Sequence, residues 1–301
     1  MKRYYSLNEY YKSKYGKKVY KLSLSGGMTC PNRDGTLDTR GCIFCGNGGS
    51  GEFAESFRLS VSEQIERAKS RVRAKTHDNA YIAYFQPFSN TYASVEYLRK
   101  LYYEAIAPDE IVGLSVATRP DCLPDNVLSL LCEINKIKPL TVELGLQTIH
   151  EHTAEYIRRG YMLSVYDEAV EKLHSIGADV VTHLIIGLPG ESRDMMFDSA
   201  EYVGRVTDGI KLQLLHVIEG TDLAVEFSNG VFDTLSLEEY ADILAGCIER
   251  IKRDVVIHRL TGDGDKRSLI APLWSADKKR VLNYINKYFD ENNVIQGSLL
   301  K

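Results

Sequence analysis

The feature that most constrains the fold is a repeated alternation of two kinds of segment. Short runs rich in β-branched and aromatic residues are followed by longer stretches in which apolar residues recur at helical spacing. One such stretch opens with Ser60 and Glu63, and another with Ser236 and Glu239, which is the capping-box pattern of a helix start. The predicted strands are residues 18–25, 80–86, 111–118, 139–147, 180–186 and 209–217. This order predicts six βα units and a parallel sheet.

Six parallel strands can form an open doubly wound sheet or an incomplete barrel, and polar alternation within the strands favours the barrel. Glu143, Gly145 and Gln147 share one face of their strand, opposite three apolar residues. Lys211 and Gln213 lie opposite two leucines in the same way. Because strands buried on both faces read as continuous apolar runs, a repeated polar face indicates a polar lumen. We therefore predict an α/β fold with a partial (β/α)6 TIM-like barrel, whose chemistry lies at the carboxyl ends of the strands.

The domain organisation follows from the absence of any Pro- or Gly-rich linker that would separate independent domains. We expect residues 1–253 to form the barrel, including an N-terminal segment and a loop that contains cysteines. Residues 254–301 follow the sixth unit, and we expect them to pack on the barrel as a C-terminal extension.

The N-terminal residues lack an apolar stretch of the length that a signal peptide or a membrane span needs. We therefore expect a cytoplasmic protein with no membrane partner. The cytosol keeps thiols reduced, so the six cysteines are expected to bind metal, to act in catalysis or to lie in the core, rather than to form disulfides.

The charge of the chain is unevenly distributed. Residues 1–75 carry fifteen Lys or Arg and seven acids, a net charge of +8, so that the remainder of this chain of net charge −4 carries −12. Such an imbalance permits a polyanionic partner such as RNA. A solvated basic face is the alternative.

Three cysteines stand close together after the first predicted strand. Cys30, Cys42 and Cys45 have the spacing C-x11-C-x2-C in a glycine-rich loop. Three thiolates suit a cubane iron–sulfur cluster, because each sulfur binds one iron and the fourth iron keeps an open site. A zinc site with His or Asp as fourth ligand and a thioredoxin-like redox pair are the alternatives from spacing alone. The remaining cysteines, Cys122, Cys132 and Cys247, are scattered, so a second cluster is not expected.

This loop, with Phe44 directly before Cys45, resembles the cluster loop of the radical S-adenosylmethionine (SAM) superfamily. Its 11-residue gap departs from the commonest family spacing of C-x3-C-x2-C, and is similar to that of the Elongator catalytic subunit and its shorter bacterial relatives. The resemblance continues through residues 118–121, 143–148 and 187–191, and the stretch 257–264 resembles the bacterial subgroup. The acetyltransferase domain of the Elongator subunit is not expected here.

The resemblance implies two cofactors, a [4Fe-4S] cluster held by the three cysteines and S-adenosyl-L-methionine bound to its open iron. In similar enzymes the loop after the second strand holds the methionine ammonium group, and here that loop contains Gln86, Ser89 and Asn90. Gln147 and Arg159 match positions that contact SAM in relatives. An arginine fork pairs well with a carboxylate, so Arg159 is expected to bind the methionine carboxylate, with Arg158 as the alternative.

Three further residues are expected near the nucleoside of SAM. The resemblance places His183 at the ribose, Gly187 against the adenine, and Phe44 packed on the ring, with loop packing as the alternative for Phe44. Glu143, Lys211 and Gln213 face the predicted lumen and are candidates for roles in substrate or proton handling. A structural ion pair between Glu143 and Lys211 is the alternative.

Other polar residues have less specific interpretations. Cys122 follows the third strand and either faces the substrate or is an inert buried thiol. The period-two count places His216 on the outer face of its strand. Trp274 is expected to pack in the core between the extension and the barrel.

The resemblance implies chemistry on the C5 side chain of wobble uridine in tRNA, and the basic first quarter is compatible with it. Without an acetyltransferase domain, remodelling an existing side chain, for example carboxymethylaminomethyl to aminomethyl, is expected rather than building one. The expected partners are tRNA and a reductant such as flavodoxin or ferredoxin. Two alternatives stay open: a radical SAM enzyme for a small metabolite or porphyrin-like substrate, and a zinc-dependent RNA-binding module.

Overall fold

The computed structural model describes residues 3–49, 51, 54–73, 78–262, 264 and 266–300. Lys2, Glu52 and Lys75 of the basic first quarter, and Asp263 of the stretch 257–264, lie outside the described residues.

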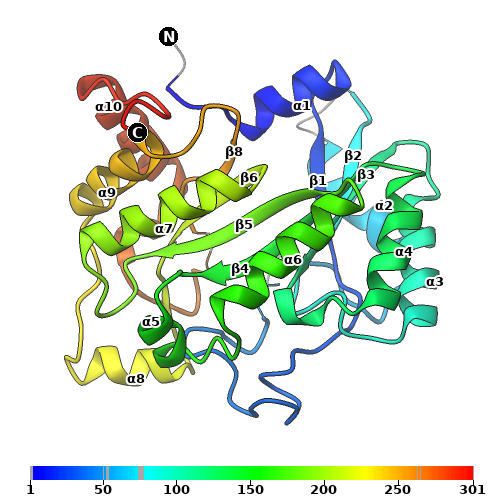
Figure 1. Ribbon diagram of the computed structural model, residues 1–301, viewed down its shortest axis with the longest axis horizontal. Coiled ribbons are helices and arrows are strands. Elements are labelled where there is room, and N and C mark those ends of the chain that lie inside the picture. The colour runs from blue at the N-terminus through cyan, green and yellow to red at the C-terminus, as the bar shows by residue number, and fades with distance from the viewer. Residues whose placement is uncertain are drawn as a thin grey trace.

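A curved parallel sheet forms the centre of the molecule (Figure 1). Its strands, in spatial order, are β1 (Tyr20–Leu24), β2 (Tyr81–Phe85), β3 (Ile111–Thr118), β4 (Leu140–Gln147), β5 (Asp179–Ile186), β6 (Gly209–Leu214) and β8 (Val256–Arg259). Every neighbouring pair is parallel. Because β1 and β8 are the two edges of the sheet, the barrel is incomplete, as the polar faces of the strands predicted.

Helices cover the outer face of the sheet (Figure 1). Those that follow strands are α2 (Val61–Val72), α3 (Val95–Ile106), α4 (Asp125–Asn135), α6 (Leu163–Ser175), α7 (Arg193–Val206) and α9 (Leu237–Glu249). The two predicted capping boxes are confirmed: Ser60 with Glu63 opens α2, and Ser236 with Glu239 opens α9. The predicted apolar face of β4 is also confirmed, since Leu144 and its two apolar neighbours on that face are fully buried.

Shorter elements lie at the two ends of the barrel. Helix α1 (Leu7–Tyr15) lies at the amino ends of the strands, where the Tyr10 hydroxyl donates a hydrogen bond to Asp179, the first residue of β5 (2.7 Å). The short segments η2 (Pro120–Cys122), α5 (Glu151–Tyr156) and α8 (Asp222–Ser228) follow strand ends on the opposite side. No helix within the described ranges combines the length and the apolar character needed to cross a membrane.

The seventh strand is a difference from the six predicted. Its residues, 256–259, were assigned to the C-terminal extension, but Val256 and Ile257 pair with the start of β6 and are buried. The run of four residues is too short to stand out in the sequence as a strand. The sheet therefore continues past residue 253, and the division into a barrel and an extension stays a prediction.

The last predicted strand, 209–217, is divided in the structure. Strand β6 ends at Leu214, and β7 (Val217–Ile218) pairs instead with β9 (Leu269–Ala271) in a separate antiparallel ladder. Segment η3 (Leu273–Ala276) and helix α10 (Lys278–Glu291) complete the chain. Trp274 packs on Tyr240 with ring centroids 5.8 Å apart, which joins this segment to α9.

Candidate active site

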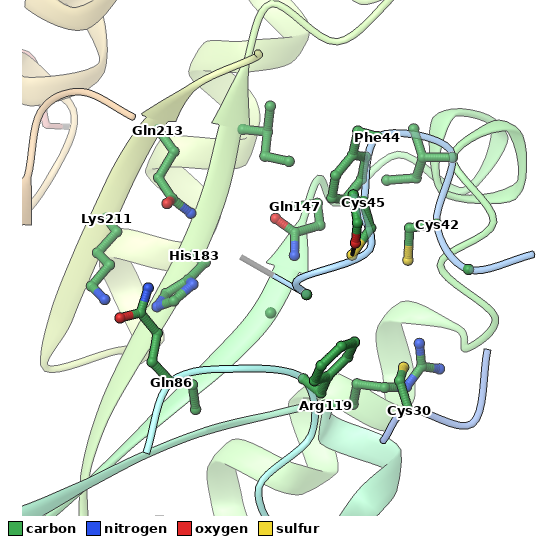
Figure 2. A pocket seen from close by; sticks show the side chains of 18 of the residues that line it. Cys30, Cys42, Phe44, Cys45, Gln86, Arg119, Gln147, His183, Lys211 and Gln213 are labelled. Carbon is green, nitrogen blue, oxygen red and sulfur yellow. Dashed lines mark hydrogen bonds between the residues drawn. The ribbon is translucent and has the colours of Figure 1, made fainter. Parts of the chain in front are cut away.

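A cavity of about 250 Å³ opens at the carboxyl ends of the strands. Its walls come from the cysteine loop and from the ends of β2 to β6 and β8. All predicted site residues line it except Asn90 and Gly187. Figure 2 shows the cysteines on one side, with Gln86, His183, Lys211 and Gln213 on the other and Gln147 between them.

Side chains within the loop fix the cysteine side of the cavity. The Asn32 amide donates to the sulfur of Cys42 (3.5 Å) and to the carbonyl of Arg158 (2.7 Å), which ties the loop to the turn after α5. The Arg33 guanidinium donates to the carbonyls of Cys45 (2.6 Å) and Gly46 (2.8 Å). Burial raises the pKa of the Cys42 thiol to about 11, so this sulfur is a neutral thiol at pH 7 and would lose its proton on binding a metal.

The three cysteines supply the sulfur donors that an iron–sulfur cluster needs. All three line one cavity. Within the part of the chain that the structure describes, no three His, Cys, Asp or Glu side chains surround a position for one metal ion. The sulfur donors and the open space beside them therefore fit an iron–sulfur cluster, and the assignment of the three ligands stays a prediction.

Gln147 has an unusual conformation in the middle of the cavity. It ends β4 with a φ of 72°, in the left-handed region, next to an irregularity in the pairing with β5. Its side-chain oxygen Oε1 is buried and has no hydrogen-bond partner among the described residues. A strained residue with an unsatisfied buried acceptor indicates a ligand that supplies the missing donor. The residues present thus fit a polar cofactor.

The arginines on the cavity wall are already engaged. Arg159 is almost fully buried, and its guanidinium donates to the carbonyls of Tyr161 (2.9 Å) and Thr148 (2.6 Å) and to Glu151 (3.0 Å). Its binding of a carboxylate stays a prediction, and would have to use the remaining N–H groups. The sequence analysis missed Arg119 as a lining residue, although its place directly after β3 was a signal.

The two predicted residues that do not line the cavity support its walls. The Asn90 amide donates to the carbonyls of Phe85 (3.2 Å), Pro87 (2.9 Å) and Ala117 (2.9 Å), and thereby shapes the loop that carries Gln86 and Ser89. Gly187 has a φ of 91° in the turn after β5, and a Cβ there would lie 3.0 Å from Leu235. This turn packs against Leu235, and Gly187 is not among the residues that line the cavity.

A buried carboxylate lies on the far side from the cysteines. Glu143 has no exposed surface. It accepts hydrogen bonds from Lys21 Nζ (2.5 Å), Ser115 Oγ (2.9 Å), Tyr84 OH (2.9 Å), His183 Nε2 (2.8 Å) and Lys211 Nζ. We call Tyr84, Gln86, Glu143, His183, Lys211 and Gln213 the lumen end of the cavity.

The charges of the lumen end follow from burial and from the ion pairs. Burial alone would raise the pKa of Glu143, but Lys21 and Lys211 outweigh it and hold this pKa well below its usual range. Burial lowers the pKa of His183 to about 4, assisted by the positive charge of Lys211. His183 is therefore neutral at pH 7. Because its Nε2–H donates to Glu143, the lone pair lies on Nδ1.

Three predictions about single residues are decided by position. His216 was expected on the outer face, which is wrong: it lines the cavity, because β6 ends at Leu214 and the alternation stops there. Cys122 is buried and does not line the cavity, and burial raises its pKa to about 12. The predicted pair of Glu143 with Lys211 is present as an ion pair. A catalytic role for either residue stays a prediction.

The sequence analysis missed three more residues in or next to the lumen end. Lys21 alternates with Leu22 in β1, so the period-two rule used for β4 and β6 would have found it. Tyr84 belongs to a strand that is buried along its whole length, which gave no signal. Arg259, which lines the cavity, lies in the strand that was not predicted.

Comparison with known proteins gives two family matches. The family model described as the radical SAM superfamily matches residues 39–203, and a model described as the Radical_SAM C-terminal domain matches residues 207–291. YtqA of Bacillus subtilis is 43% identical over 301 residues, which is 100% of this chain and 94% of that protein.

Two more distant matches are a tRNA uridine(34) acetyltransferase and the structure of an Elp3 protein. A tRNA uridine(34) acetyltransferase of Methanocaldococcus jannaschii is 27% identical over 183 residues, 56% of this chain and 32% of that protein. The solved structure of Methanocaldococcus infernus Elp3 with an N-terminal deletion has a TM-score of 0.72 at 17% identity, covering 92% of this chain and 64% of the other. At that identity the likeness shows the fold alone.

The Glu143 network predicts a large loss of stability on neutralisation. In the variant Glu143→Gln, Lys21 and Lys211 remain buried without a counter-charge, so the free energy of unfolding should fall by about 3–5 kcal/mol at pH 7. Urea denaturation measures this. The control Glu168→Gln removes an exposed pair with Lys172 and should leave the stability nearly unchanged. Equal effects of the two variants would contradict the assigned role of Glu143.

The lowered pKa of His183 predicts how the stability of the protein depends on pH. Its pKa is about 4 in the folded state and about 6.5 when unfolded, so unfolding takes up protons between these values. The free energy of unfolding should therefore fall as the pH drops from about 6.5 to 4. His183→Gln keeps a donor to Glu143 and should flatten this slope, whereas His152→Gln, at an exposed position, should not. If the free energy of unfolding had the same pH dependence in the wild type and in both variants, this result would count against a neutral buried His183.

Proposed function

Because this chain belongs to the radical SAM superfamily, we propose that it uses radical chemistry to remodel the C5 side chain of wobble uridine in tRNA. The conversion of carboxymethylaminomethyl to aminomethyl is our example of such a reaction: the N–CH2 carbon of the carboxymethyl group would be oxidised with SAM as the oxidant, and water would then cleave the C–N bond and release the two-carbon unit as glyoxylate. When bound, the [4Fe-4S] cluster and SAM supply a 5'-deoxyadenosyl radical that abstracts hydrogen from the substrate.

The residues of the cysteine side would hold the cluster. Cys30, Cys42 and Cys45 provide three sulfur ligands, and the Asn32 amide would donate to one of them, which is one means by which proteins set the potential of a cluster. SAM would lie in the cavity next to these residues. Gln86 and Ser89 are our candidates for the methionine ammonium group, and Arg159 for its carboxylate.

The remaining lining residues would position SAM and exclude water. Gln147 lines the middle of the cavity, and we assign its buried oxygen, which has no partner among the described residues, to a hydrogen bond from the cofactor. We assign His183 to the ribose and Phe44 to the adenine ring. Neutral His183 can accept a hydrogen bond at Nδ1 while Glu143 holds its other nitrogen.

We choose tRNA as the substrate because of the match to the tRNA uridine(34) acetyltransferase. That name states both a tRNA substrate and the wobble position, and the match lies over the radical SAM part of this chain. The chain matches only about a third of that protein, so its acetyltransferase activity is not transferred. We propose remodelling of an existing side chain because such a reaction needs only the radical SAM part, which the two proteins share.

The charge of the cavity speaks against the small-metabolite or porphyrin-like alternative, which a narrow acidic lumen would favour. Glu143 is the one acid among the described residues that line the cavity. The basic lining residues are Arg33, Arg119, Arg159, Lys211 and Arg259. Because the chain belongs to the radical SAM superfamily, we do not propose a zinc-dependent RNA-binding module.

The proposal includes two partners and a location. A reductant such as flavodoxin or ferredoxin would supply the electron, and tRNA would be the substrate. The basic first quarter supports tRNA binding only in part, because Lys14 lies at the opposite end and pairs with Asp179, while Lys69 and Arg71 pair with acids. We place the protein in the cytoplasm, where both partners occur.

The cysteine assignment predicts the behaviour of two cysteine variants. Anaerobically reconstituted protein, given dithionite and SAM, should release 5'-deoxyadenosine, and Cys42→Ala should abolish this release because one cluster ligand is lost. Cys132→Ala, which removes a cysteine outside the cavity, should retain it. The amount of 5'-deoxyadenosine is measured by chromatography, and release that persists in Cys42→Ala would refute the ligand assignment.

The substrate assignment predicts a change in tRNA. Nucleoside mass spectrometry of tRNA from a strain lacking the gene should show that the precursor, such as 5-carboxymethylaminomethyluridine, accumulates at the expense of its product. Plasmid-borne wild type should restore the profile, and the Cys42→Ala variant should not. A wobble uridine profile identical to that of the parent strain would overturn the substrate assignment and leave the cofactor chemistry intact.

A further inference from the structure

The ion-pair network around Glu143, which joins the lumen end to Lys21, holds more positive than negative charge. Lys21 from β1 and Lys211 from β6 both donate to the single carboxylate of Glu143. Among these three side chains, one positive charge is therefore left without an acid. All three are mostly or fully shielded from solvent, so water does little to compensate it.

Lys211 is the lysine that faces the cavity. Its ammonium group has three N–H donors, of which one reaches Glu143 and one the Tyr84 hydroxyl (3.2 Å). Burial lowers the pKa of Lys211 to about 7 despite Glu143, and the charges of Lys21 and Arg259 lower it further. An anion entering the cavity would restore the charge balance and keep Lys211 protonated.

Neutral polar groups surround Lys211 on the open side. Figure 2 shows the side chains of Gln86 and His183 next to the end of Lys211, with Gln213 further along the same wall of the cavity. The two amides can donate to oxygen, and His183 Nδ1 is an acceptor. The group therefore offers donors for a small planar anion and one acceptor for a neighbouring N–H. A single uncompensated charge matches a monoanion rather than a phosphate dianion.

We propose that the lumen end is a subsite for a substrate carboxylate, held by Lys211 with the amides of Gln86 and Gln213. An amine adjacent to the carboxylate would donate to His183. This inference rests on the proposed function for the identity of the side chain, since a carboxymethylamino group carries both features. It adds the chemical class of the group that the enzyme recognises.

The test uses a small probe in place of tRNA. N-methylglycine carries the amine and carboxylate of the proposed side chain, and N-methylglycinamide is its counterpart without the carboxylate charge. Binding to anaerobically reconstituted protein with SAM is measured by ligand-observed NMR titration. We expect the carboxylate to bind about tenfold more tightly or better, the gain typical of a hydrogen bond to a charged group. Equal affinity for acid and amide in the wild type would overturn the subsite.

Variants of Lys211 and competition by phosphate test whether the preference for the carboxylate arises at the lumen end. Lys211→Met should abolish the preference for the carboxylate, whereas Lys14→Met, a lysine at the other end of the barrel, should retain it. A preference that survives in folded Lys211→Met overturns the role of Lys211. If this variant does not fold, the wild-type comparison and the charge-retaining Lys211→Arg decide. Inorganic phosphate competing more strongly than N-methylglycine would overturn the choice of a carboxylate.

The two proposals fail separately. An unaltered tRNA nucleoside profile overturns the tRNA substrate, but the probe titration still decides whether the lumen end selects a carboxylate. Conversely, a loss of the modified nucleoside in the deletion strain together with equal affinity for acid and amide leaves the tRNA substrate in place and removes the subsite.

Discussion

One buried carboxylate joins most of the sheet. Glu143 on β4 accepts hydrogen bonds from side chains on β1, β2, β3, β5 and β6, so that six strands converge on one group inside the barrel. A carboxylate without exposed surface needs such a set of donors, because burial would otherwise favour its neutral form. The same donors then have fixed positions, since each is held by the one acceptor. The polar floor of the cavity is thus also a structural element of the barrel.

The open edge of the sheet and the cysteine loop complete the cavity above this floor. The cysteine loop extends well beyond the end of β1, and hydrogen bonds from Asn32 and Arg33 anchor it at separate points. The walls between the cysteines and Glu143 contain Gln147 and the loop shaped by Asn90. Sulfur ligands at one side and a charged polar group at the other therefore face the same space, which suits a cofactor at the first and a substrate at the second.

The sequence revealed the parts of this site that have a periodic or local signature. Alternation in β4 and β6 identified Glu143, Lys211 and Gln213 as lining residues, and the cysteine spacing predicted a metal-binding loop, whose three cysteines line the same cavity. Tyr84 could not be found in this way because its strand is apolar on both faces, and Arg259 lies in a strand too short to recognise. His216 was misplaced because a period-two count contains no information about where the strand ends. Asn90 and Gly187 came from resemblance to relatives, which places a residue near a site without saying whether it reaches the cavity.

The amide of Asn32 has a further consequence. One NH2 group serves both the sulfur of Cys42 and the backbone of the turn that carries Arg158 and Arg159. The two contacts share a rigid planar group, so a displacement of that turn changes the hydrogen bond at the sulfur. The Asn32 carboxamide thus couples the position of the wall that contains Arg159 to the hydrogen bonding of Cys42, the predicted cluster ligand.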